Sequence, residues 1–292
     1  MLKYFSLIFT SIFLLVGICF YQNAKLNDGK LHIIVCDVGQ GDGILIITPD
    51  GSDILVDGGP DDSILNCLSS HLPFWDRTIE LMVLTHPHTD HAAGLVDVLK
   101  RYTVLHFVTE KVLGSTATYK RLEDELSIQK LTTKYLFSGD RIDLADKTQL
   151  LTLWPSREWL TLPQLQAGNG TSDSVNLDLN GFCLIQLLTY GNFKVLLTGD
   201  AGSLTEDRIV AEAGKVDVLK VPHHGSKTGM SDYFLSQINP SIAIISVGAN
   251  NRYGHPAQTA LDLLKSHNIK TFRTDQNKAV EIVSDGQIFS VN

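Results

Sequence analysis

The string HPHTDH, directly after a short apolar run, constrains the fold of this chain more than any other stretch of its sequence. The apolar run occupies residues 81–84 and predicts a buried β-strand, and a helix is expected from about Ala92. Four side chains that can bind metal follow this strand, namely His86, His88, Asp90 and His91. Because side chains alternate along an extended segment, His86 and His88 can point to the same ion. Asp90 and His91 can then reach a second ion, so the string favours a metal site over an ordinary polar loop.

The composition is that of a packed globular protein. The 292 residues are 43% hydrophobic and 19% charged, which is sufficient for a large buried core. The formal net charge of −8 excludes an overall basic surface, so any contact with nucleic acid phosphates must be local. The cysteines form no CxxC pair, and we interpret them as small core residues and expect no disulfide framework. They are Cys19, Cys36, Cys67 and Cys183.

An uncharged and mostly apolar segment opens the chain, between Lys3 and Lys25. Its length of about 17 to 20 residues is enough to cross a bilayer as one helix. Asn23 and Ala24 make a poor cleavage site, so residues 1–25 are expected to be a signal anchor in preference to a removed signal peptide. Since Lys3 precedes the segment, the positive-inside rule predicts a membrane-anchored or secreted body outside the cytoplasm.

Further polar turns follow predicted strands along the rest of the chain. In the first half these are DVGQGDG at residues 37–43 and DGG at residues 57–59, and in the second half VPHHGS at residues 221–226 and NNRYGHP at residues 250–256. The string LLTGD ends in Asp200, and a carboxylate at the end of a buried strand is costly unless it is paired or bound to metal. Because α/β architectures place their sites just after strands, we expect these turns to meet at one site.

Five strings together resemble the metallo-β-lactamase superfamily: DVGQGDG, HPHTDH, LLTGD, VLKVPHHGS and ISVGANNRYGHP. They are most similar to the branch formed by the C-terminal hydrolase domain of the DNA-internalisation competence protein ComEC and its stand-alone relatives. The resemblance implies an α/β fold, a four-layer αββα sandwich with two β-sheets face to face and helices outside. It covers roughly residues 32–290 and implies one hydrolase domain over residues 26–292, built from two similar halves with a seam over residues 155–173.

The resemblance also implies two divalent metal ions, most readily Zn²⁺, with Mn²⁺ accepted by the same ligands. Asp200 would bridge both ions, and one histidine of the HHGS turn would complete the second site. Only one of that pair can easily point inward, and His223 is placed ahead of His224. The residues assigned to the two ions are His86, His88, Asp90, His91, Asp200 and His223.

The chain departs from the family pattern at two places. Most of the superfamily supplies a third histidine to the first ion, but His106 is the only histidine between His91 and Asp200. Because His106 lies within the apolar run 103–108, we predict that it is a core residue. Where relatives often have an asparagine followed three residues later by serine, this chain has Asn180 and Cys183.

The implied activity is metal-assisted hydrolysis of a phosphodiester, with single-stranded DNA as the substrate suggested by the competence branch. Asp90 and His255 are the expected catalytic residues, His255 either as the acid that protonates the leaving group or as a ligand. The residues expected to bind substrate are Asn180, His224, Ser226, Lys227 and Arg252. The alternatives are a hydrolase of small esters, lactones or phosphorylcholine, and a non-catalytic module that binds a partner or nucleic acid.

Overall fold

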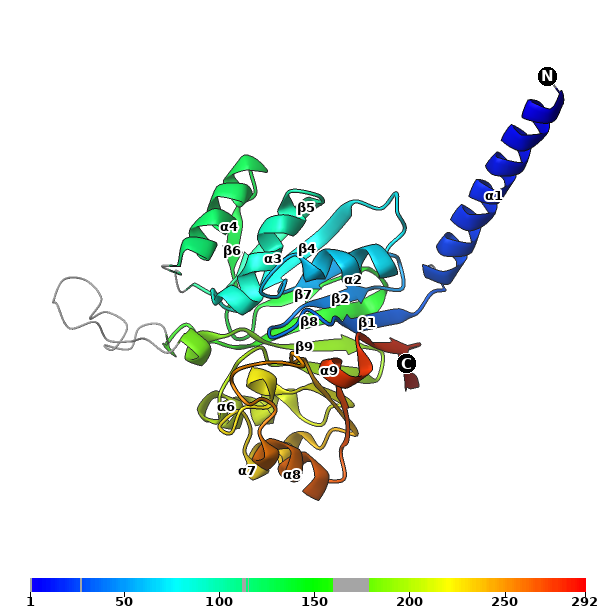
Figure 1. Ribbon diagram of the computed structural model, residues 1–292. Helices are drawn as coiled ribbons and strands as arrows, with labels where there is room; N and C mark the ends of the chain where they lie inside the picture. Colours follow the sequence, from blue (N-terminus) through cyan, green and yellow to red (C-terminus); the bar gives the residue numbers. More distant parts are fainter. Residues whose placement is uncertain (1, 27, 112–113, 115, 160–178) are drawn as a thin grey trace.

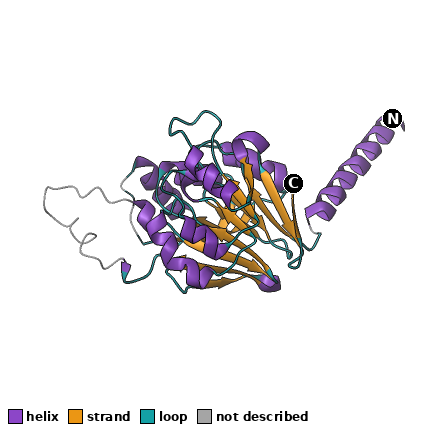
Figure 2. Ribbon diagram, turned by 90° about the horizontal axis from the view of Figure 1, so that it is seen from below, coloured by secondary structure: helices purple, strands orange, loops and turns teal. Residues whose placement is uncertain are grey.

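Two β-sheets lie face to face in the computed structural model, and helices cover their outer faces (Figures 1 and 2). The structure describes residues 2–26, 28–111, 114, 116–159 and 179–292. The expected αββα sandwich is therefore confirmed, as an α/β fold with two mixed sheets between helical layers.

The first sheet combines antiparallel hairpins with a parallel half. Its eight strands lie side by side in the order β15 (Phe289–Val291), β14 (Val280–Ser284), β1 (Leu31–Val35), β2 (Ile44–Ile47), β3 (Asp53–Val56), β4 (Thr78–Leu84), β5 (Thr103–Thr109) and β6 (Thr133–Tyr135). Pairing is antiparallel from β15 to β3 and parallel from β3 to β6. The parallel strands therefore end at one edge of the sheet, with β4 among them.

The second sheet repeats this plan. Its seven strands are, in order, β13 (Lys270–Arg273), β12 (Ile242–Ile245), β11 (Val218–Lys220), β10 (Phe193–Leu197), β9 (Ile185–Tyr190), β8 (Thr148–Trp154) and β7 (Arg141–Asp143). The strands from β13 to β10 are parallel and the strands from β10 to β7 are antiparallel. Two similar halves were expected, and the matching strand plans agree with that expectation.

Helices form the two outer layers and short helical turns join the strands. The α-helices of the sandwich are α2 (Ser63–His71), α3 (Thr89–Leu99), α4 (Ala117–Ile128), α6 (Ser203–Ala213), α7 (Asp232–Ile238), α8 (Gln258–Ser266) and α9 (Thr274–Asn277). The 3₁₀ turns are η1 (Ala145–Lys147), η3 (Leu179–Phe182) and η4 (Pro222–Gly225).

Three separate cores hold the four layers together. One lies between the first sheet and its helices and includes Ile34, Leu68, Leu95 and Leu122. The second lies between the sheets and includes Ile33, Ile46, Leu188 and Val195. The third lies between the second sheet and its helices and includes Leu187, Leu219, Phe234 and Leu264. Ile33 and Ile34 belong to different cores because successive side chains of a strand point to opposite faces of the sheet.

The two halves of the chain exchange strands between the sheets, and the seam expected over residues 155–173 stays a prediction. Most of the range 155–173 lies outside the described residues. Strands β7 and β8 come before it in the sequence but pair with β9, and β14 returns from the end of the chain to pair with β1. Each sheet is thus completed by strands from the other half of the chain, which satisfies backbone groups that would otherwise lie at a sheet edge.

Helix α1 (Leu2–Leu26) extends away from the sandwich (Figure 1), and its described apolar side chains, such as Leu7 and Phe13, are exposed. Within the described part of the chain, no helix has both the length and the apolar character needed to cross a membrane. The signal anchor or signal peptide expected over residues 1–25, and the membrane contact that goes with it, stay predictions.

The expectation that the cysteines form no disulfide was wrong for one pair. Cys36 and Cys67 are joined by a disulfide, with their Cα atoms 5.9 Å apart. Cys36 directly follows β1, and Cys67 lies on α2, which packs on the same sheet. Since α2 was not predicted, nothing in the sequence brought these two residues together across 31 positions. Cys183 is buried and free, as expected.

The prediction that His106 is a core residue was also wrong. His106 and its neighbour Leu105 are exposed, although Phe107 next to them is buried. Strand β6 pairs only with Phe107 and the two residues after it, so the first half of β5 has no strand on that side. An apolar run can therefore contain an exposed position where the sheet ends.

Reduction of the Cys36–Cys67 disulfide should lower the free energy of unfolding by about 2–4 kcal/mol, because the bond restricts the unfolded chain. Denaturant titrations of the oxidised and reduced protein measure this difference. The double variant Cys36→Ala/Cys67→Ala should resemble the reduced protein and no longer respond to reductant. Equal stability of the oxidised and reduced wild-type protein would show that the bond does not constrain this fold.

Candidate metal centre

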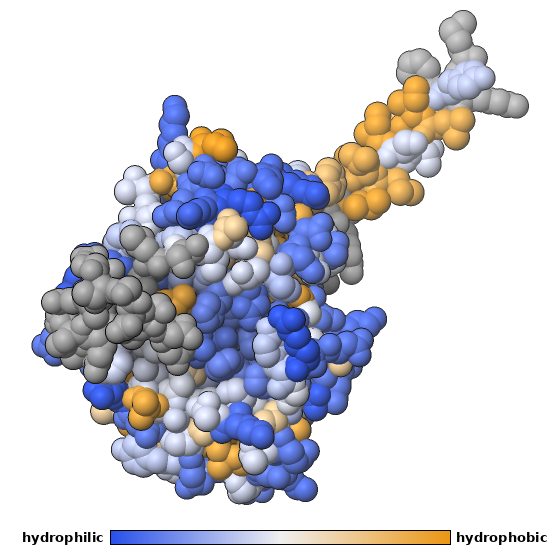
Figure 3. Space-filling model, turned by 60° about the vertical axis from the view of Figure 1, so that its left-hand side comes forward, coloured by the Kyte–Doolittle hydropathy of each residue, from blue (hydrophilic) through white to orange (hydrophobic). Residues whose placement is uncertain are grey.

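The predicted ligands meet because the strands that carry them end at the same place in the sandwich. His86 follows β4, and Asp90 and His91 begin α3. Asp200 follows β10 in the second sheet, and His224 lies in η4 directly after β11. In Figure 3, hydrophilic side chains gather in a hollow at mid-height, between the part that carries α2 to α4 and the part that carries α6 to α8.

Glycines allow the turns around the centre to interlock. Gly58 donates its N–H to His91 O at 2.8 Å, and Gly94 donates to Gly59 O at 3.1 Å. A Cβ atom on Gly94 would lie 1.9 Å from Gly58 O, and one on Gly41 would lie 2.1 Å from Asp90 O. Only glycine permits this close backbone approach. The DVGQGDG and DGG strings are therefore required to seat the first turn of α3.

The ligand atoms of Asp90, His91, Asp200 and His224 all lie within 4.8 Å of one another. His91 Nε2 and His224 Nε2 are each 3.3 Å from Asp200 Oδ1. His224 Nε2 is also 3.8 Å from Asp90 Oδ2. Asp90 is the most accessible member, with 31% of its side chain exposed, while the other three are buried. Asp90 therefore faces the mouth of the site.

Groups behind the cluster fix the direction of both imidazoles. His91 Nδ1 lies 2.8 Å from Asp57 Oδ2, and Asp57 also accepts hydrogen bonds from the backbone and hydroxyl of Thr85. His224 Nδ1 donates to the carbonyl of Ser246 at 2.9 Å. Because each Nδ1 is engaged, each Nε2 is directed at Asp200.

Three inward atoms of this cluster have no hydrogen-bond partner among the described residues: His91 Nε2, His224 Nε2 and Asp200 Oδ1. Buried polar atoms without partners are rare in folded proteins. Here they converge, and two imidazole nitrogens with carboxylate oxygens are a ligand set suited to Zn²⁺ or Mn²⁺. The residues therefore fit a divalent cation.

A second group of nitrogen ligands lies beside the cluster. His86 Nε2 and His88 Nδ1 face each other at 2.9 Å, and the ring of His86 lies 4.2 Å from that of His91. On its other side His86 Nδ1 lies 3.6 Å from the buried Cys183 Sγ. Cys183 Sγ also accepts the backbone N–H of Asp200 at 3.2 Å. Cys183 therefore contacts a residue of each ligand group.

Strong opposite charges face each other in the cluster. Burial raises the pKa of Asp200, but His224 and His91 lower it by more, to well below its usual range. Burial lowers the pKa of both histidines, yet the neighbouring carboxylates raise it, for His91 to well above its usual range and for His224 to about 9. Protonated imidazoles thus supply the positive charge when no cation is bound.

The structure places His224 in the cluster, whereas the sequence suggested His223. Both residues adopt left-handed backbone conformations, with φ of 47° for His223 and 54° for His224. This turn directs His224 inward, and His223 keeps 31% of its side chain exposed with Nε2 3.9 Å from Asp200 Oδ2. The hydrogen bond from His224 Nδ1 to the Ser246 carbonyl holds His224 inward. The two residues are 22 positions apart, so the local sequence could not show which of the two histidines points inward.

His255 also reaches the edge of the centre. Its ring lies 5.7 Å from that of His223 and 6.5 Å from that of His224. Partial burial, together with the nearby His223 and His224, lowers the pKa of His255. His255 is therefore neutral at pH 7.

The residues expected to bind substrate are distributed around this edge. Ser226, the last residue of the HHGS turn, is buried, and Lys227 next to it is exposed. Arg252 is exposed and stacks over the ring of Tyr253. Asn180 lies in η3, which leads to Cys183. Of the five residues expected to bind substrate, these four lie outside the ligand cluster, whereas His224 belongs to it.

No role was expected for Lys220, which is buried next to the cluster. Lys220 forms an ion pair with Asp42 and donates to Gly199 O at 3.0 Å. Burial lowers the pKa of Lys220, but Asp42 and Asp200 raise it above its ordinary value. The position of Lys220 inside the apolar run VLKVP could have indicated this buried ion pair, because a cation there must find a buried partner.

Known proteins resemble this chain in sequence and in fold. Residues 36–249 match the family model described as the Metallo-beta-lactamase superfamily. The chain is 29% identical over 277 residues to ComE operon protein 3 of Bacillus subtilis. This match covers 87% of this chain and 33% of that protein. The chain is 30% identical over 244 residues to Recombination protein 2 of Haemophilus influenzae. This match covers 82% of this chain and 27% of that protein. The chain thus spans a third or less of these relatives.

Among solved structures, Zn²⁺-bound PqqB of Methylobacterium extorquens matches with a TM-score of 0.54 and 14% identity. The match covers 83% of this chain and 97% of that chain. At this level of identity the likeness shows a shared fold.

Without metal, the protein should lose stability as the pH rises from about 6.5 to above 9. The pKa of His224 is about 9 in the folded protein against an ordinary value of 6.5, so its proton stabilises the fold below pH 6.5. That contribution disappears as the pH rises through 9. Metal binding needs the neutral imidazole, so metal should stabilise the protein more at higher pH.

Thermal unfolding between pH 6 and 9.5, with and without zinc, measures both trends. His224→Gln is the matched control and should reduce the pH dependence of the metal-free protein. Constant stability of the metal-free protein between pH 6.5 and 9 would contradict the described charge states.

Lys220→Met should lower the free energy of unfolding by about 3–5 kcal/mol, because it leaves the Asp42 carboxylate buried without its cation. Lys227→Met is the matched control at an exposed position and should change stability by no more than about 0.5 kcal/mol. Denaturant titration compares the two. Similar losses of stability in both variants would show that the ion pair of Lys220 does not stabilise the centre.

Proposed function

Because the chain belongs to the metallo-beta-lactamase superfamily, we propose that residues 26–292 form a metal-dependent hydrolase that cleaves phosphodiesters. The observation that carries this proposal is the convergence of the ligand atoms of Asp90, His91, Asp200 and His224 within 4.8 Å. One relative is named for recombination, a process that acts on DNA, and this favours a nucleic acid phosphodiester over a small ester.

We propose two divalent ions, with zinc preferred and manganese accepted. Asp90, His91, Asp200 and His224 would hold one ion, and His86 and His88 would share Asp200 to hold the other. This assignment is supported by the unpartnered inward atoms of His91, His224 and Asp200, and by the facing nitrogens of His86 and His88. When bound, the ions supply a nucleophile derived from water and stabilise negative charge on the phosphoryl oxygens.

The chain's own groups prepare the site for this reaction. Asp57 and the Ser246 carbonyl fix the two imidazoles, so little reorganisation is needed when a ligand enters. Asp90 is ionised, because His224 and His91 lower its pKa by more than burial raises it. At the mouth of the site it can orient a water molecule or accept its hydrogen bond.

Neutral His255, whose ring lies 6.5 Å from that of His224, can donate an N–H hydrogen bond to the leaving-group oxygen. Lys227 and Arg252 are exposed cations on the two loops that carry His224 and His255. They suit an anionic substrate, and Ser226 and Asn180 add polar groups next to them.

We also propose that this domain works outside the cytoplasm, either anchored by residues 1–25 or secreted. The Cys36–Cys67 disulfide supports this location, since disulfides persist in oxidising compartments. The exposed apolar side chains of α1 are consistent with an export signal.

Zinc-loaded protein should hydrolyse both single-stranded DNA and bis(p-nitrophenyl) phosphate. Asp200→Asn keeps the shape of the side chain but removes the charge that would hold two cations together, so turnover should fall below about 1% of wild type. Metal analysis should then show loss at both sites, whereas His88→Ala should leave one ion largely in place. His267→Ala, at a histidine that pairs with the exposed Asp232 and is not among the proposed ligands, is the control.

Three outcomes would replace this proposal. Hydrolysis of the aryl phosphodiester without cleavage of DNA would indicate a small-molecule hydrolase. Folded protein that binds no metal and cleaves neither substrate would indicate a binding module. Folded Asp200→Asn protein that retains both ions and near-normal turnover would show that Asp200 does not bridge.

A further inference from the structure

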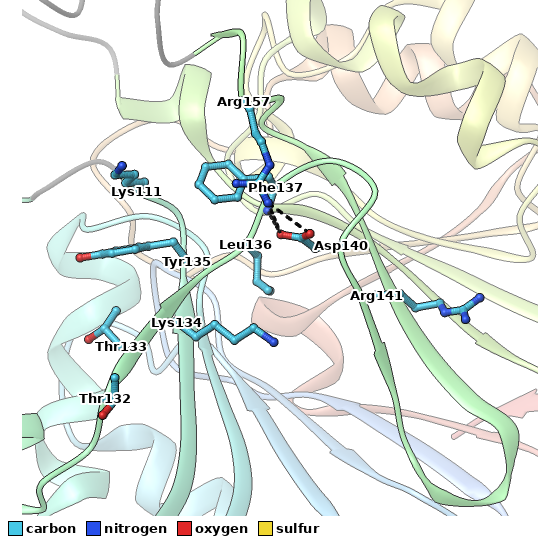
Figure 4. Close-up of a pocket in the computed structure, with 10 residues that line it drawn as sticks. All are labelled: Lys111, Thr132, Thr133, Lys134, Tyr135, Leu136, Phe137, Asp140, Arg141 and Arg157. Carbon is cyan, nitrogen blue, oxygen red and sulfur yellow. Dashed lines mark hydrogen bonds and ion pairs between the residues drawn. The ribbon is translucent and has the colours of Figure 1, made fainter.

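A hollow of about 730 Å³ lies at the side of the sandwich, between the last strands of the two sheets (Figure 4). Strand β6 is the outer strand of the first sheet and β7 is the outer strand of the second. The side chains that matter most at this hollow are Lys111, Lys134, Tyr135, Phe137, Arg141 and Arg157. They come from β6, from β7 and from the segments that follow β5, β6 and β8.

The hollow is positively charged on a chain that is negative overall. Four of its lining side chains are cationic and one, Asp140, is anionic, while the whole chain has a formal charge of −8. Arg157 lies 3.5 Å from Asp140 and Arg141 lies 3.1 Å from Asp143, so two of the cations are partly neutralised. A basic patch confined to one place is what an anionic partner requires of such a chain.

The two lysines are the least neutralised of the four cations. Lys111 and Lys134 are exposed, and within the described part of the chain neither has a carboxylate oxygen within 4.0 Å. Their ammonium groups are therefore available to phosphate oxygens.

Aromatic rings stand among these cations. The guanidinium carbon of Arg157 lies 3.9 Å from the centre of the Phe137 ring. Tyr135 also lines the hollow, and its partly exposed ring points to the side of β6 where Lys111 lies, away from Lys134 (Figure 4). Flat guanidinium and aromatic faces are surfaces on which unpaired bases stack. A simple phosphate or sulfate would use the cations but not these rings.

The hollow continues into a second one. Thr132 and Lys134 line both, and the neighbour has a volume of about 580 Å³ with Lys130 and the unexpectedly exposed His106 on its wall. An elongated pair of hollows suits a chain of several nucleotides better than a single small anion.

The hollow also opens on the same edge as the metal centre. Strands β4, β5 and β6 are parallel, with Leu84 opposite Thr109 and Thr109 opposite Tyr135. Tyr135 therefore lies about 10 Å from the end of β4, which is two strand spacings, and His86 lies just beyond that end. A strand bound in the hollow can reach the cluster within a few nucleotides.

We propose that this hollow is an accessory site for single-stranded nucleic acid that leads to the metal centre. The inference rests on the proposed phosphodiesterase function and selects a polymeric substrate for it. Lys111 and Lys134 bind backbone phosphates, Tyr135 stacks on a base, and Arg157 on Phe137 provides a second stacking face.

The test measures binding of a fluorescent 12-nucleotide thymidine strand to the full-length zinc-loaded protein by anisotropy, with the strand checked on a gel after each titration. Lys111→Gln/Lys134→Gln should weaken binding at least about tenfold at low salt. It should also reduce the slope of log affinity against log salt by about 1.4, the value for two phosphate contacts on a single strand. Lys215→Gln/Lys265→Gln, two exposed lysines of the other half, is the matched control and should leave both quantities unchanged.

A second variant separates nucleic acid from other phosphate chains. Tyr135→Ser should weaken binding of the thymidine strand but not of an abasic strand of the same length. Unchanged binding in the lysine variant, or equal competition by inorganic polyphosphate together with no effect of Tyr135→Ser, would overturn the inference.

Hydrolysis of bis(p-nitrophenyl) phosphate distinguishes this failure from failure of the proposed function. The hollow variants should retain the wild-type kcat and KM for that small substrate, because the metal centre is untouched. Absence of hydrolysis in the wild-type protein would instead remove the phosphodiesterase proposal on which the inference rests.

Discussion

The buried carboxylate of Asp200 is the constraint on which the rest of this structure depends. It is 2% exposed, and its Oδ1 lies 3.3 Å from the imidazole nitrogens of both His91 and His224. Removing a carboxylate from water costs several kcal/mol unless positive charge faces it. Both sheets must therefore end their strands at this point, one supplying His91 through α3 and the other supplying Asp200 and His224.

The same constraint explains the polar groups behind the ligands. Asp57 holds His91, the Ser246 carbonyl holds His224, and Lys220 balances Asp42 at the base of the cluster. Glycine turns with no room for a Cβ atom lock the first turn of α3 against these groups. Such prior orientation is what lets a metal site bind its ion without rearrangement.

Local strings predicted the strand ends and three of the four residues of the candidate cluster, because HPHTDH and LLTGD each place a polar group directly after an apolar strand. The features that were missed depend on contacts between distant segments. The Cys36–Cys67 pair needed helix α2, and the inward turn of His224 needed the carbonyl of Ser246, 22 residues later. His106 became exposed because β6 is too short to cover the start of β5, which no periodicity within β5 could indicate.

The most direct test of the account is anomalous diffraction at the zinc edge from crystals of the zinc-loaded protein. We expect an anomalous peak about 2.0–2.2 Å from His91 Nε2, His224 Nε2 and Asp200 Oδ1. We expect a second peak between His86 Nε2 and His88 Nδ1. Crystals grown with saturating zinc that show no peak at the cluster, with both Nε2 atoms still about 3.3 Å from Asp200 Oδ1, would contradict this assignment.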